Sequence, residues 1–217
     1  TMSHELRTPM NGVIGMANLL LTTPLTNEQE DFTTSIQESA TSLLSLINDL
    51  LDFFIIRAGK LELENIPFDL RKTISKAIYP LSHRAKEKMI KLNLTIAGDV
   101  PPVLIGDPLR LQQVIINLAS NAVKYTSKGS VEIAIDVINV AKGQVIIKGA
   151  VKDSGIGIPE NMQAHIFESF TQTSAEDARK YGGTGLGLAI VKQLIDMQQG
   201  EISVKSTVGI GSIFYFD

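Results

Sequence analysis

Apolar residues near the start of the chain recur at helical spacing. The pattern covers residues 3–22 and ends at Pro24, which predicts a first helix that stops before that proline. A Thr-x-x-Gln sequence from Thr26 to Gln29 follows. In this capping box the side chain of each of the two residues can accept a hydrogen bond from the backbone amide of the other, which the start of a helix leaves without a partner. We therefore expect a second helix from this point. The apolar positions of the first helix are Val13, Ala17, Leu20 and Leu21.

The second helix carries two neighbouring apolar rows, spaced alternately four and three residues apart. These rows are Phe32, Ile36, Ser39, Leu43, Leu46, Leu50 and Phe53, with Ala40, Leu44, Ile47, Leu51 and Phe54 beside them. One hairpin of two helices cannot bury so wide a face, so we expect two hairpins to pair as a homodimeric four-helix bundle. The alternative is that this face packs on the remainder of its own chain.

After Gly59 the pattern changes to a mixture of helices and strands. Antiparallel hairpins between helices favour an α/β sandwich, with one helical layer on one mixed sheet. The predicted fold class of the whole chain is therefore α+β, a helical hairpin followed by this sandwich. Strands are predicted at residues 60–64, 92–96, 130–140, 144–151, 201–206 and 211–216, with a turn at Lys142-Gly143, and helices at 70–89, after Asp107-Pro108 and after Gly187.

Composition narrows the class of protein. The 217 residues are 44% hydrophobic with a net charge of −3, which suits two small domains and gives no general attraction to nucleic acid or anionic membranes. No unbroken run of about 18 apolar residues and no signal-peptide pattern is present. We expect a soluble, cytoplasmic fragment without membrane contact of its own. Further sequence is expected upstream of Thr1, and a membrane anchor of the complete protein is left open.

Cysteine and histidine usage limits the metal chemistry. The chain has no cysteine, which excludes disulfides and cysteine-based metal sites. Its histidines, His4, His83 and His165, lack the spacing of metal ligands.

His4 is a candidate nucleophile, because neutral imidazole can attack near neutral pH. Thr8 lies one helical turn further on the same face, whereas Glu5 points about 100° away. Pro9 cannot donate to the carbonyl of Glu5 and should kink the helix. The alternative is an ordinary surface histidine at a helix start.

In the helix after Asp107, three polar residues share one face: Asn117, Asn121 and Lys124. Asparagine costs roughly 0.5 kcal/mol relative to alanine within a helix, so a merely solvated face would favour other residues. An amide oxygen can join a magnesium shell that also holds phosphate oxygens, and a lysine can reach a phosphate. The alternative is a solvent-exposed polar face.

Two glycine-containing segments follow. Asp153 stands at a predicted strand end before Gly155 and Gly157, and its carboxylate can accept a hydrogen bond from an adenine amine. A simple turn is the alternative. Residues 181–189 run from glycines into a helix, whose free amides can bind phosphate. This segment matches neither the Walker A nor the dinucleotide motif, and the polar loop at residues 171–180 is long enough to be a lid.

Five motifs in this order resemble the H, N, first glycine, F and second glycine boxes of sensor histidine kinases, and most closely those of hybrid kinases. They read SHELRTP, NLASNAVKYT, DSGIGIP, IFESFTQ and YGGTGLGLAIV, and residues 209–212 match a weaker final glycine box. The resemblance implies a dimerisation and phosphoacceptor domain at residues 1–60. It implies an ATP-binding domain of the Bergerat type, as in gyrase and heat-shock chaperone ATPases, at residues 61–217.

The resemblance also assigns roles by position. It makes His4 the phosphorylated nucleophile, Glu5 its acid/base helper, and Thr8 the residue that orients water during dephosphorylation of a partner. Asn121 would bind Mg²⁺ and Asp153 would bind adenine. The other implied ATP contacts are Asn117 beside the metal, Lys124 on phosphate and Tyr125 in the pocket, together with the turn residues Gly155, Gly157 and Ile158 and the phosphate turn Gly183, Thr184, Gly185, Leu186, Gly187 and Leu188. The lid would be anchored by Phe167 and Phe170, for which ordinary core packing is the alternative.

Two segments depart from the family pattern. Residues 52–60 read DFFIIRAGK where hybrid kinases commonly read DFSKIEAGK, and residues 198–200 read QQG for the more usual MGG. The first change puts the docking of the two domains in doubt.

The resemblance predicts a histidine autokinase that transfers the γ-phosphate of Mg-ATP to His4, from which a receiver-domain aspartate takes it. A receiver phosphatase activity is also consistent with Thr8. The alternatives are a dimeric scaffold that no longer phosphorylates, supported by residues 54–57, and a stand-alone ATPase, which the intact histidine motif argues against.

Overall fold

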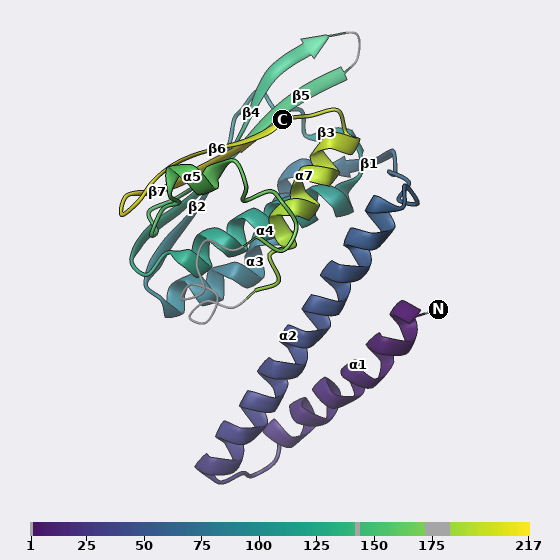
Figure 1. Ribbon diagram of the computed structural model, residues 1–217, viewed down its shortest axis with the longest axis vertical. Coiled ribbons are helices and arrows are strands. Elements are labelled where there is room, and N and C mark those ends of the chain that lie inside the picture. The colour runs from purple at the N-terminus through teal and green to yellow at the C-terminus, as the bar shows by residue number, and fades with distance from the viewer. Residues whose placement is uncertain (1, 142–143, 172–182) are drawn as a thin grey trace. The chain divides into compact units, whose positions relative to one another are not determined.

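The computed structural model describes residues 2–141, 144–171 and 183–217, with side chains for all of these except residues 2–4 and 139–141. Two compact units divide the chain, Thr1–Gly59 and Lys60–Asp217. The first is a helical hairpin and the second a sheet with helices, as Figure 1 shows. They are called the helical unit and the α/β unit below.

The helical unit consists of α1 (Met2–Leu21) and α2 (Asn27–Arg57), which run antiparallel. Both predicted helices are confirmed. The predicted capping box is present, because the Thr26 hydroxyl accepts from the Gln29 amide at 3.3 Å and the Gln29 side chain accepts from the Thr26 amide at 3.0 Å. At the other end of α2, Gly59 has a φ of +64°, which a side chain would disfavour, and so it allows the chain to leave the helix.

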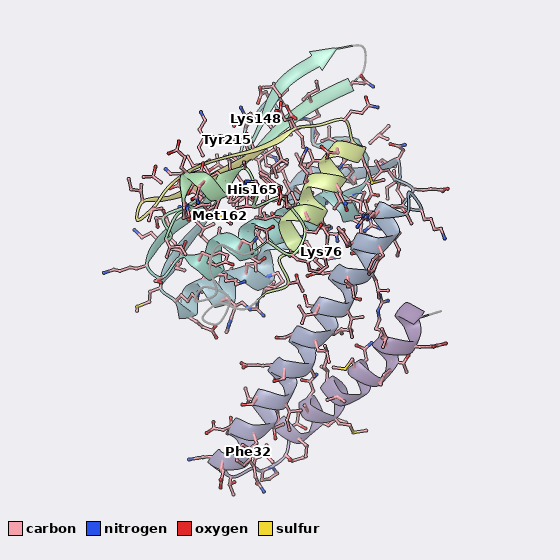
Figure 2. All side chains as sticks on the ribbon, in the orientation of Figure 1. Phe32, Lys76, Lys148, Met162, His165 and Tyr215 are labelled. Carbon is pink, nitrogen blue, oxygen red and sulfur yellow. The ribbon has the colours of Figure 1, made fainter. Side chains whose placement is uncertain are left out.

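A broad apolar face remains open on this hairpin. Its side chains are between 38% and 67% exposed, and they include several of the apolar positions expected to face a bundle. A groove of about 480 Å³ runs along this face between the two helices, lined by Pro9, Gly12, Val13, Met16, Ala17, Leu20, Thr33 and Ile36. The open side chains are Val13, Met16, Leu19, Leu20, Phe32 (labelled in Figure 2), Ile36, Leu43, Leu46 and Leu50.

Among the described residues, only α2 is long and apolar enough to cross a membrane, with a window of mean hydropathy 1.5. The sequence expectation of no span rested on unbroken apolar runs. In α2 polar residues such as Ser39, Asn48 and Asp49 separate the apolar ones. The same composition is typical of a helix in a bundle, whose outer face is polar, so length and hydropathy alone do not distinguish the two environments.

The α/β unit is built on a five-stranded sheet in the order β2-β4-β5-β7-β6. Its strands are β2 (Ile90–Ile96), β4 (Gly129–Ala141), β5 (Gln144–Asp153), β6 (Ile202–Thr207) and β7 (Gly211–Phe216). β2 and β4 are parallel, and the other neighbours are antiparallel, so the predicted mixed sheet is confirmed. The turn predicted at Lys142-Gly143 lies outside the described residues.

One layer of helices covers one face of this sheet, as predicted. It consists of α3 (Leu70–Glu87), α4 (Pro108–Tyr125) and α7 (Gly187–Met197), with α4 in contact with both other helices. The core lies between the layers and includes the fully buried Leu118, Ile133, Val151, Ile190 and Leu194. The short helix α5 (Glu160–Gln163) follows β5.

One strand prediction was wrong and one pair of strands was missed. Residues 60–64 form no strand, although Leu61 and Leu63 turn inward as their alternation predicts. The amide of Glu64 donates to the Asp107 carboxylate at 3.1 Å instead of joining a ladder. A separate two-stranded sheet pairs β1 (Ile66–Asp69) with β3 (Val103–Gly106), and four residues are too few for a recognisable alternation.

The strands β4 and β5 extend past their neighbours as a two-stranded ribbon, visible at the top of Figure 1. β2 pairs with β4 only as far as Ile135, and β7 pairs with β5 only from Gly149 onward. A bulge interrupts the ribbon near Ile138. At its base the Lys148 ammonium lies 5.1 Å from the centre of the Tyr215 ring, and both residues are labelled in Figure 2.

Candidate functional site

The phosphoacceptor candidates lie in the first turns of α1. The backbone of His4 is helical, while its side chain lies outside the described residues. Glu5 and Thr8 are exposed, and Pro9 lies inside the same helix. Helical geometry therefore places the Cα atoms of His4 and Thr8 on one face, as predicted, with a weakened backbone ladder just beyond them.

In the α/β unit, α4 carries the predicted polar face. Asp107 caps its start, accepting from the amides of Leu109 and Arg110, each at 3.0 Å. Asn117, Asn121 and Lys124 are half-buried along one side of the helix, whereas Val114, Leu118 and Ala122 are buried in the core. Three half-buried polar side chains in a row are not the solvent-exposed face that was the alternative.

The Asn117 side chain lies beside the start of α7. Its Oδ1 lies 3.5 Å from the position that a Cβ on Gly187 would occupy. The Nδ2 atom of Asn117 is buried and has no hydrogen-bond partner among the described residues. A buried amide group without a partner is costly unless something else binds there, so this side of α4 is suited to a polar ligand.

Lys124 brings α4 against the glycine-rich turn. Burial leaves the Lys124 ammonium poorly solvated, which lowers the pKa of the amine and strengthens the attraction of the ammonium to an anion. Its Nζ lies 4.9 Å from the Tyr125 ring centre. A Cβ on Gly183 would lie only 2.8 Å from this Nζ, and Gly183 has a φ of +120°. The positive φ favours glycine where the turn meets the lysine.

A further lysine, which the sequence analysis missed, supports the end of α4. The Lys88 ammonium donates to the carbonyl oxygens of Val123 at 2.9 Å and Lys124 at 3.0 Å. These carbonyls belong to the last turn of α4, where helix geometry leaves acceptors free and the dipole is negative. Lys88 thereby fixes the backbone from which the Lys124 and Tyr125 side chains project.

Asp153 ends β5 and is buried, at 8% exposure. Burial raises the pKa of its carboxyl group, while hydrogen bonds from the amides of Gly155 and Ser212 oppose the rise. The Gly155 amide lies 2.8 Å from Oδ1. A Cβ on Gly155 would approach the Tyr125 carbonyl to 2.6 Å, so glycine is needed here as predicted. The result is a desolvated acceptor beside the end of α4.

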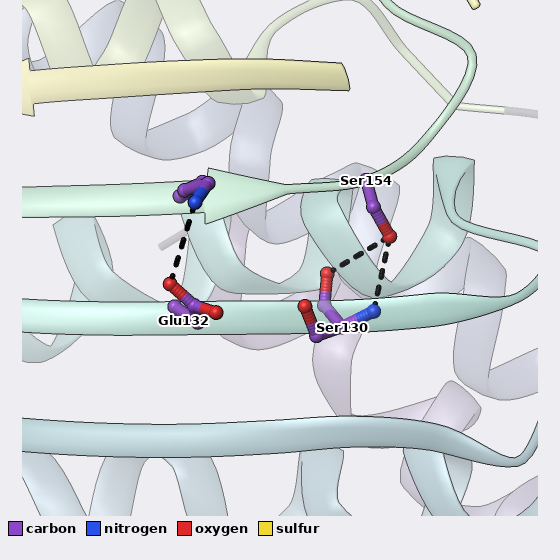
Figure 3. Close-up of polar contacts among 4 residues, drawn as sticks. Ser130, Glu132 and Ser154 are labelled. Atoms are coloured by element: carbon purple, nitrogen blue, oxygen red, sulfur yellow. Dashed lines mark hydrogen bonds and ion pairs between the residues drawn. The ribbon is translucent and has the colours of Figure 1, made fainter. Parts of the chain in front are cut away.

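Ser154 does not belong to this acceptor site. Its hydroxyl accepts from the Ser130 amide at 3.0 Å and lies 3.3 Å from the Ser130 carbonyl, as Figure 3 shows. An ion pair between Lys152 and Glu132, at 3.7 Å, joins the same two strands. These contacts join the start of β4 to the end of β5, so the Ser154 hydroxyl has a structural role.

The turn after Asp153 is bound to the far hairpin of the sheet. Gly157 has a φ of +72°, and a Cβ there would lie 2.1 Å from the Thr207 carbonyl. The Ile158 amide donates to the Ser206 hydroxyl at 2.7 Å. The Gln163 amide group donates to both the Ile158 and Ser206 carbonyls, at 3.0 and 2.9 Å. Sequence reasoning missed Ser206 and Gln163, since a serine in an alternating strand carries no signal of such a contact.

The phosphate turn lies at the start of α7. Gly185 has a φ of +70° with the backbone of Phe170 2.8 Å from its Cβ position, and the Thr184 hydroxyl accepts from the Leu186 amide at 3.2 Å. Within the described part of the chain, no side chain caps the first turn of α7 at Leu186. Its amides are thus suited to an anion. Leu186 is 1% exposed, so only its backbone can serve a ligand, whereas Leu188 is half-buried.

The two aromatic residues before this turn differ. Phe167 packs edge-on against Phe214 with ring centres 6.3 Å apart, which fits the core alternative. Phe170 is 61% exposed and has a φ of +64°, and its amide donates to the Gly185 carbonyl at 3.0 Å. Phe170 is therefore attached to the phosphate turn and not to the core. The predicted lid at residues 171–180 lies outside the described residues, except for Thr171.

No group of three or more histidine, cysteine or acidic side chains is positioned to hold a metal among the described residues. A cation at this site would need ligands from elsewhere. Magnesium bound to a nucleotide takes most of its oxygen ligands from phosphates and water, and a single amide oxygen can complete the shell. The half-buried Asn121, one turn from Asn117 and Lys124, fits that requirement.

Comparisons with known proteins match both parts of the chain. Residues 106–217 match the family model described as histidine kinase-, DNA gyrase B- and HSP90-like ATPase, and residues 1–59 match the His kinase A phospho-acceptor domain. Over 99% of its length the chain is 47% identical to the signal transduction histidine-protein kinase BarA of Escherichia coli K12. It is 42% identical, again over 99%, to the sensor protein GacS of Pseudomonas syringae. It spans 23% and 24% of those relatives, respectively.

Solved structures agree with these matches. Full-length ShkA in complex with AMPPNP is 38% identical, with a TM-score of 0.78, covering 100% of this chain and 44% of that one. The Acinetobacter baumannii histidine kinase AdeS is 23% identical with a TM-score of 0.65, covering 98% of this chain and 95% of that one, and so supports the fold alone. AMPPNP is an analogue of ATP, so in ShkA a similar fold occurs together with an adenine nucleotide.

Proposed function

The chain belongs to the histidine kinases of two-component signalling, as an autokinase core, and we propose that it transfers the γ-phosphate of ATP to His4. One observation carries the nucleotide part of this proposal. The Lys124 ammonium of α4 reaches Gly183 of the glycine-rich turn, where its Nζ lies 2.8 Å from the position of a Cβ, and the same helix ends beside the turn that binds Asp153. A cationic group, an anion-binding turn and a buried acceptor are thus adjacent.

In the proposed site, the adenine amino group donates a hydrogen bond to the Asp153 carboxylate, which burial has already desolvated. The Tyr125 ring lines the pocket. The phosphates lie against the first-turn amides of α7 and the Lys124 ammonium, because the helix dipole and the ammonium both favour negative charge there. Gly157 and Ile158 hold the turn after Asp153 against β6, and so support the part of the site that would bind the base.

Magnesium would be held by the Asn121 amide oxygen together with phosphate oxygens and water, with Asn117 beside it. When bound, the ion supplies charge neutralisation on the phosphates. The contribution of this chain is to position Asn121 and Lys124 on one rigid helix, which Asp107 caps at one end and Lys88 at the other. Such preorganised charge is the main means of lowering the barrier to phosphoryl transfer.

At the acceptor, a ring nitrogen of His4 attacks the γ-phosphorus in line with the leaving ADP oxygen, and Glu5 takes or holds the proton of the imidazole. A receiver-domain aspartate, in this protein or another, then takes the phosphoryl group. In the proposed receiver phosphatase activity, Thr8 orients a water molecule toward a phosphorylated receiver. The exposed position of Glu5 and Thr8 in α1 leaves room for such a partner.

The open apolar face of the helical unit supports a homodimer. A face with side chains up to 67% exposed costs free energy in water, at roughly 25 cal/mol per Å² of apolar surface. Pairing two hairpins into a four-helix bundle removes this cost. The proposed location is cytoplasmic for this portion, because its substrates are ATP and an intracellular receiver.

The test uses γ-labelled ATP with the chain and with His4→Gln. The proposal requires an acid-labile, alkali-stable label on the unaltered chain and none on the variant, with ATP affinity within about twofold, since substitutions in separate units act independently. Nucleotide binding without any label would favour a non-catalytic scaffold. Phosphate release without label would favour a stand-alone ATPase, and label on His4→Gln would refute the choice of acceptor.

A further inference from the structure

Three polar side chains form a row across the end of the sheet in the α/β unit. Asp153 of β5 is the register partner of Ser212 of β7, and Ser212 is in turn the register partner of Ser206 of β6. Directly opposed residues in antiparallel strands project from the same face of a sheet. The row therefore runs from the proposed base-binding carboxylate to a serine two strands away.

The Ser206 hydroxyl is the hub of a saturated hydrogen-bond network. It lies 2.7 Å from the Ile158 amide, 2.9 Å from the Gly211 carbonyl and 2.9 Å from the Ser212 hydroxyl. A serine hydroxyl has one proton and two lone pairs. These three partners use all of them.

The identity of the partners fixes the direction of each hydrogen bond. The Ile158 amide can only donate, and the Gly211 carbonyl can only accept, so the single Ser206 proton points to Gly211. The remaining lone pair of Ser206 is then available only to a donor, and Ser212 must supply its own proton. Ser212 is left with lone pairs and no proton to offer elsewhere.

The consequence concerns the side of the proposed site that faces the base, which Asp153 and Ser212 form and which is called the base-binding wall below. Ser212 is 5% exposed and its backbone amide already binds the Asp153 carboxyl group. With its hydroxyl proton committed to Ser206, Ser212 presents only acceptor character beside a carboxylate that also only accepts. A base edge that carries an amino group matches this wall, whereas one that carries a carbonyl oxygen is repelled.

We propose that Ser206 is a specificity-positioning residue, which orients the Ser212 hydroxyl so that the site selects adenine over guanine nucleotides. The proposal rests on the proposed ATP function. Ser206 acts through Ser212 and does not itself contact the base. Without Ser206 the Ser212 hydroxyl can rotate and donate toward the ligand, and the guanine carbonyl gains a partner that it lacks in the unaltered chain.

The test compares non-hydrolysable ATP and GTP analogues with magnesium by titration calorimetry on the whole chain. Ser206→Ala should reduce the preference for ATP by about tenfold, the effect of reversing one hydrogen bond in a buried site. Ser206→Thr, which keeps a hydroxyl, should retain the preference. Ser203→Ala is the matched control, because Ser203 lies on the same strand but is exposed.

A double variant separates orientation from simple support. Ser206→Ala combined with Ser212→Ala removes the proton that was set free, and so should restore most of the preference that Ser206→Ala lost. Equal loss of both analogues in Ser206→Ala, or no recovery in the double variant, overturns the proposal. If Ser206→Ala does not fold, Ser206→Cys replaces it, since a thiol makes only weak hydrogen bonds. Failure of the unaltered chain to bind either analogue would instead refute the proposed ATP function.

Discussion

The Lys124 ammonium lies against Gly183, since a Cβ on the glycine would come within 2.8 Å of the lysine Nζ. The contact joins two segments almost 60 positions apart in the chain, the end of α4 and the glycine-rich turn. The φ of +120° at Gly183 makes this part of the site sensitive even to alanine.

Gly183→Ala should weaken ATP binding by at least about tenfold, or roughly 1.4 kcal/mol, because the methyl group displaces the ammonium and the φ of +120° becomes strained. Titration with a fluorescent ATP analogue measures the effect. Gly98→Ala is the matched control, since a Cβ at Gly98 meets nothing within 4 Å. An unchanged affinity in Gly183→Ala would argue that the turn does not meet the nucleotide.

Asp153→Asn should weaken ATP binding by more than about tenfold, because the amide replaces an acceptor with a donor toward the adenine amino group. Burial raises the pKa of the Asp153 carboxyl group, so in the unaltered chain ATP affinity should fall as the pH drops toward and below that raised value. Calorimetry over a pH series measures both effects. A variant that binds ATP as tightly as the parent would remove Asp153 from the site.

Ile36→Lys should dissociate the proposed dimer, since it places a charge on the open apolar face beside the groove of the helical unit. Thr41→Lys adds the same charge to an exposed position of α2 that does not line this groove, and should leave the dimer intact. Light scattering after size-exclusion chromatography measures the molar mass of each variant. Dissociation by both variants alike would show that added charge, and not the apolar face, controls assembly.

Asp49→Asn should stabilise the helical unit near pH 7.5 by a few degrees in Tm, and have little effect near pH 4. Burial, together with the Asp52 carboxylate, raises the pKa of Asp49 from 3.8 to about 6. The folded state therefore binds the proton more tightly than the unfolded state, and stability is lost as the pH rises through this window. Asp31→Asn, an exposed position on the same helix, is the control for thermal melts at both pH values.

Periodicity predicted those parts of the molecule that depend on one element at a time. The shared face of Asn117, Asn121 and Lys124 follows from helical geometry alone, as does the capping box at Thr26, and both are present. The glycines at 155 and 157 were also assigned correctly to close backbone contacts. Each of these features is encoded within a few neighbouring residues.

Features that depend on register between distant strands were not predictable. Ser206 reads as an ordinary polar position of a strand until the pairing of β6 with β7 and the approach of Ile158 are known. Lys88 likewise reads as a solvated lysine after a helix, although it binds two carbonyls of another helix. The motif placed Leu186 at the ligand, but the Leu186 side chain is buried in the core. A sequence motif does not distinguish a residue that binds through its backbone from one that binds through its side chain.

The projecting β4–β5 ribbon exposes the chain to self-association. Beyond Ile135 and before Gly149 each described strand has an outer edge with no ladder partner, and Ile138 and Ile146 are 52% and 43% exposed there. Such edges can recruit a strand from another molecule and seed aggregates. The bulge near Ile138 and the charge of Lys148 work against that pairing, and so limit the tendency of this ribbon to recruit a further strand.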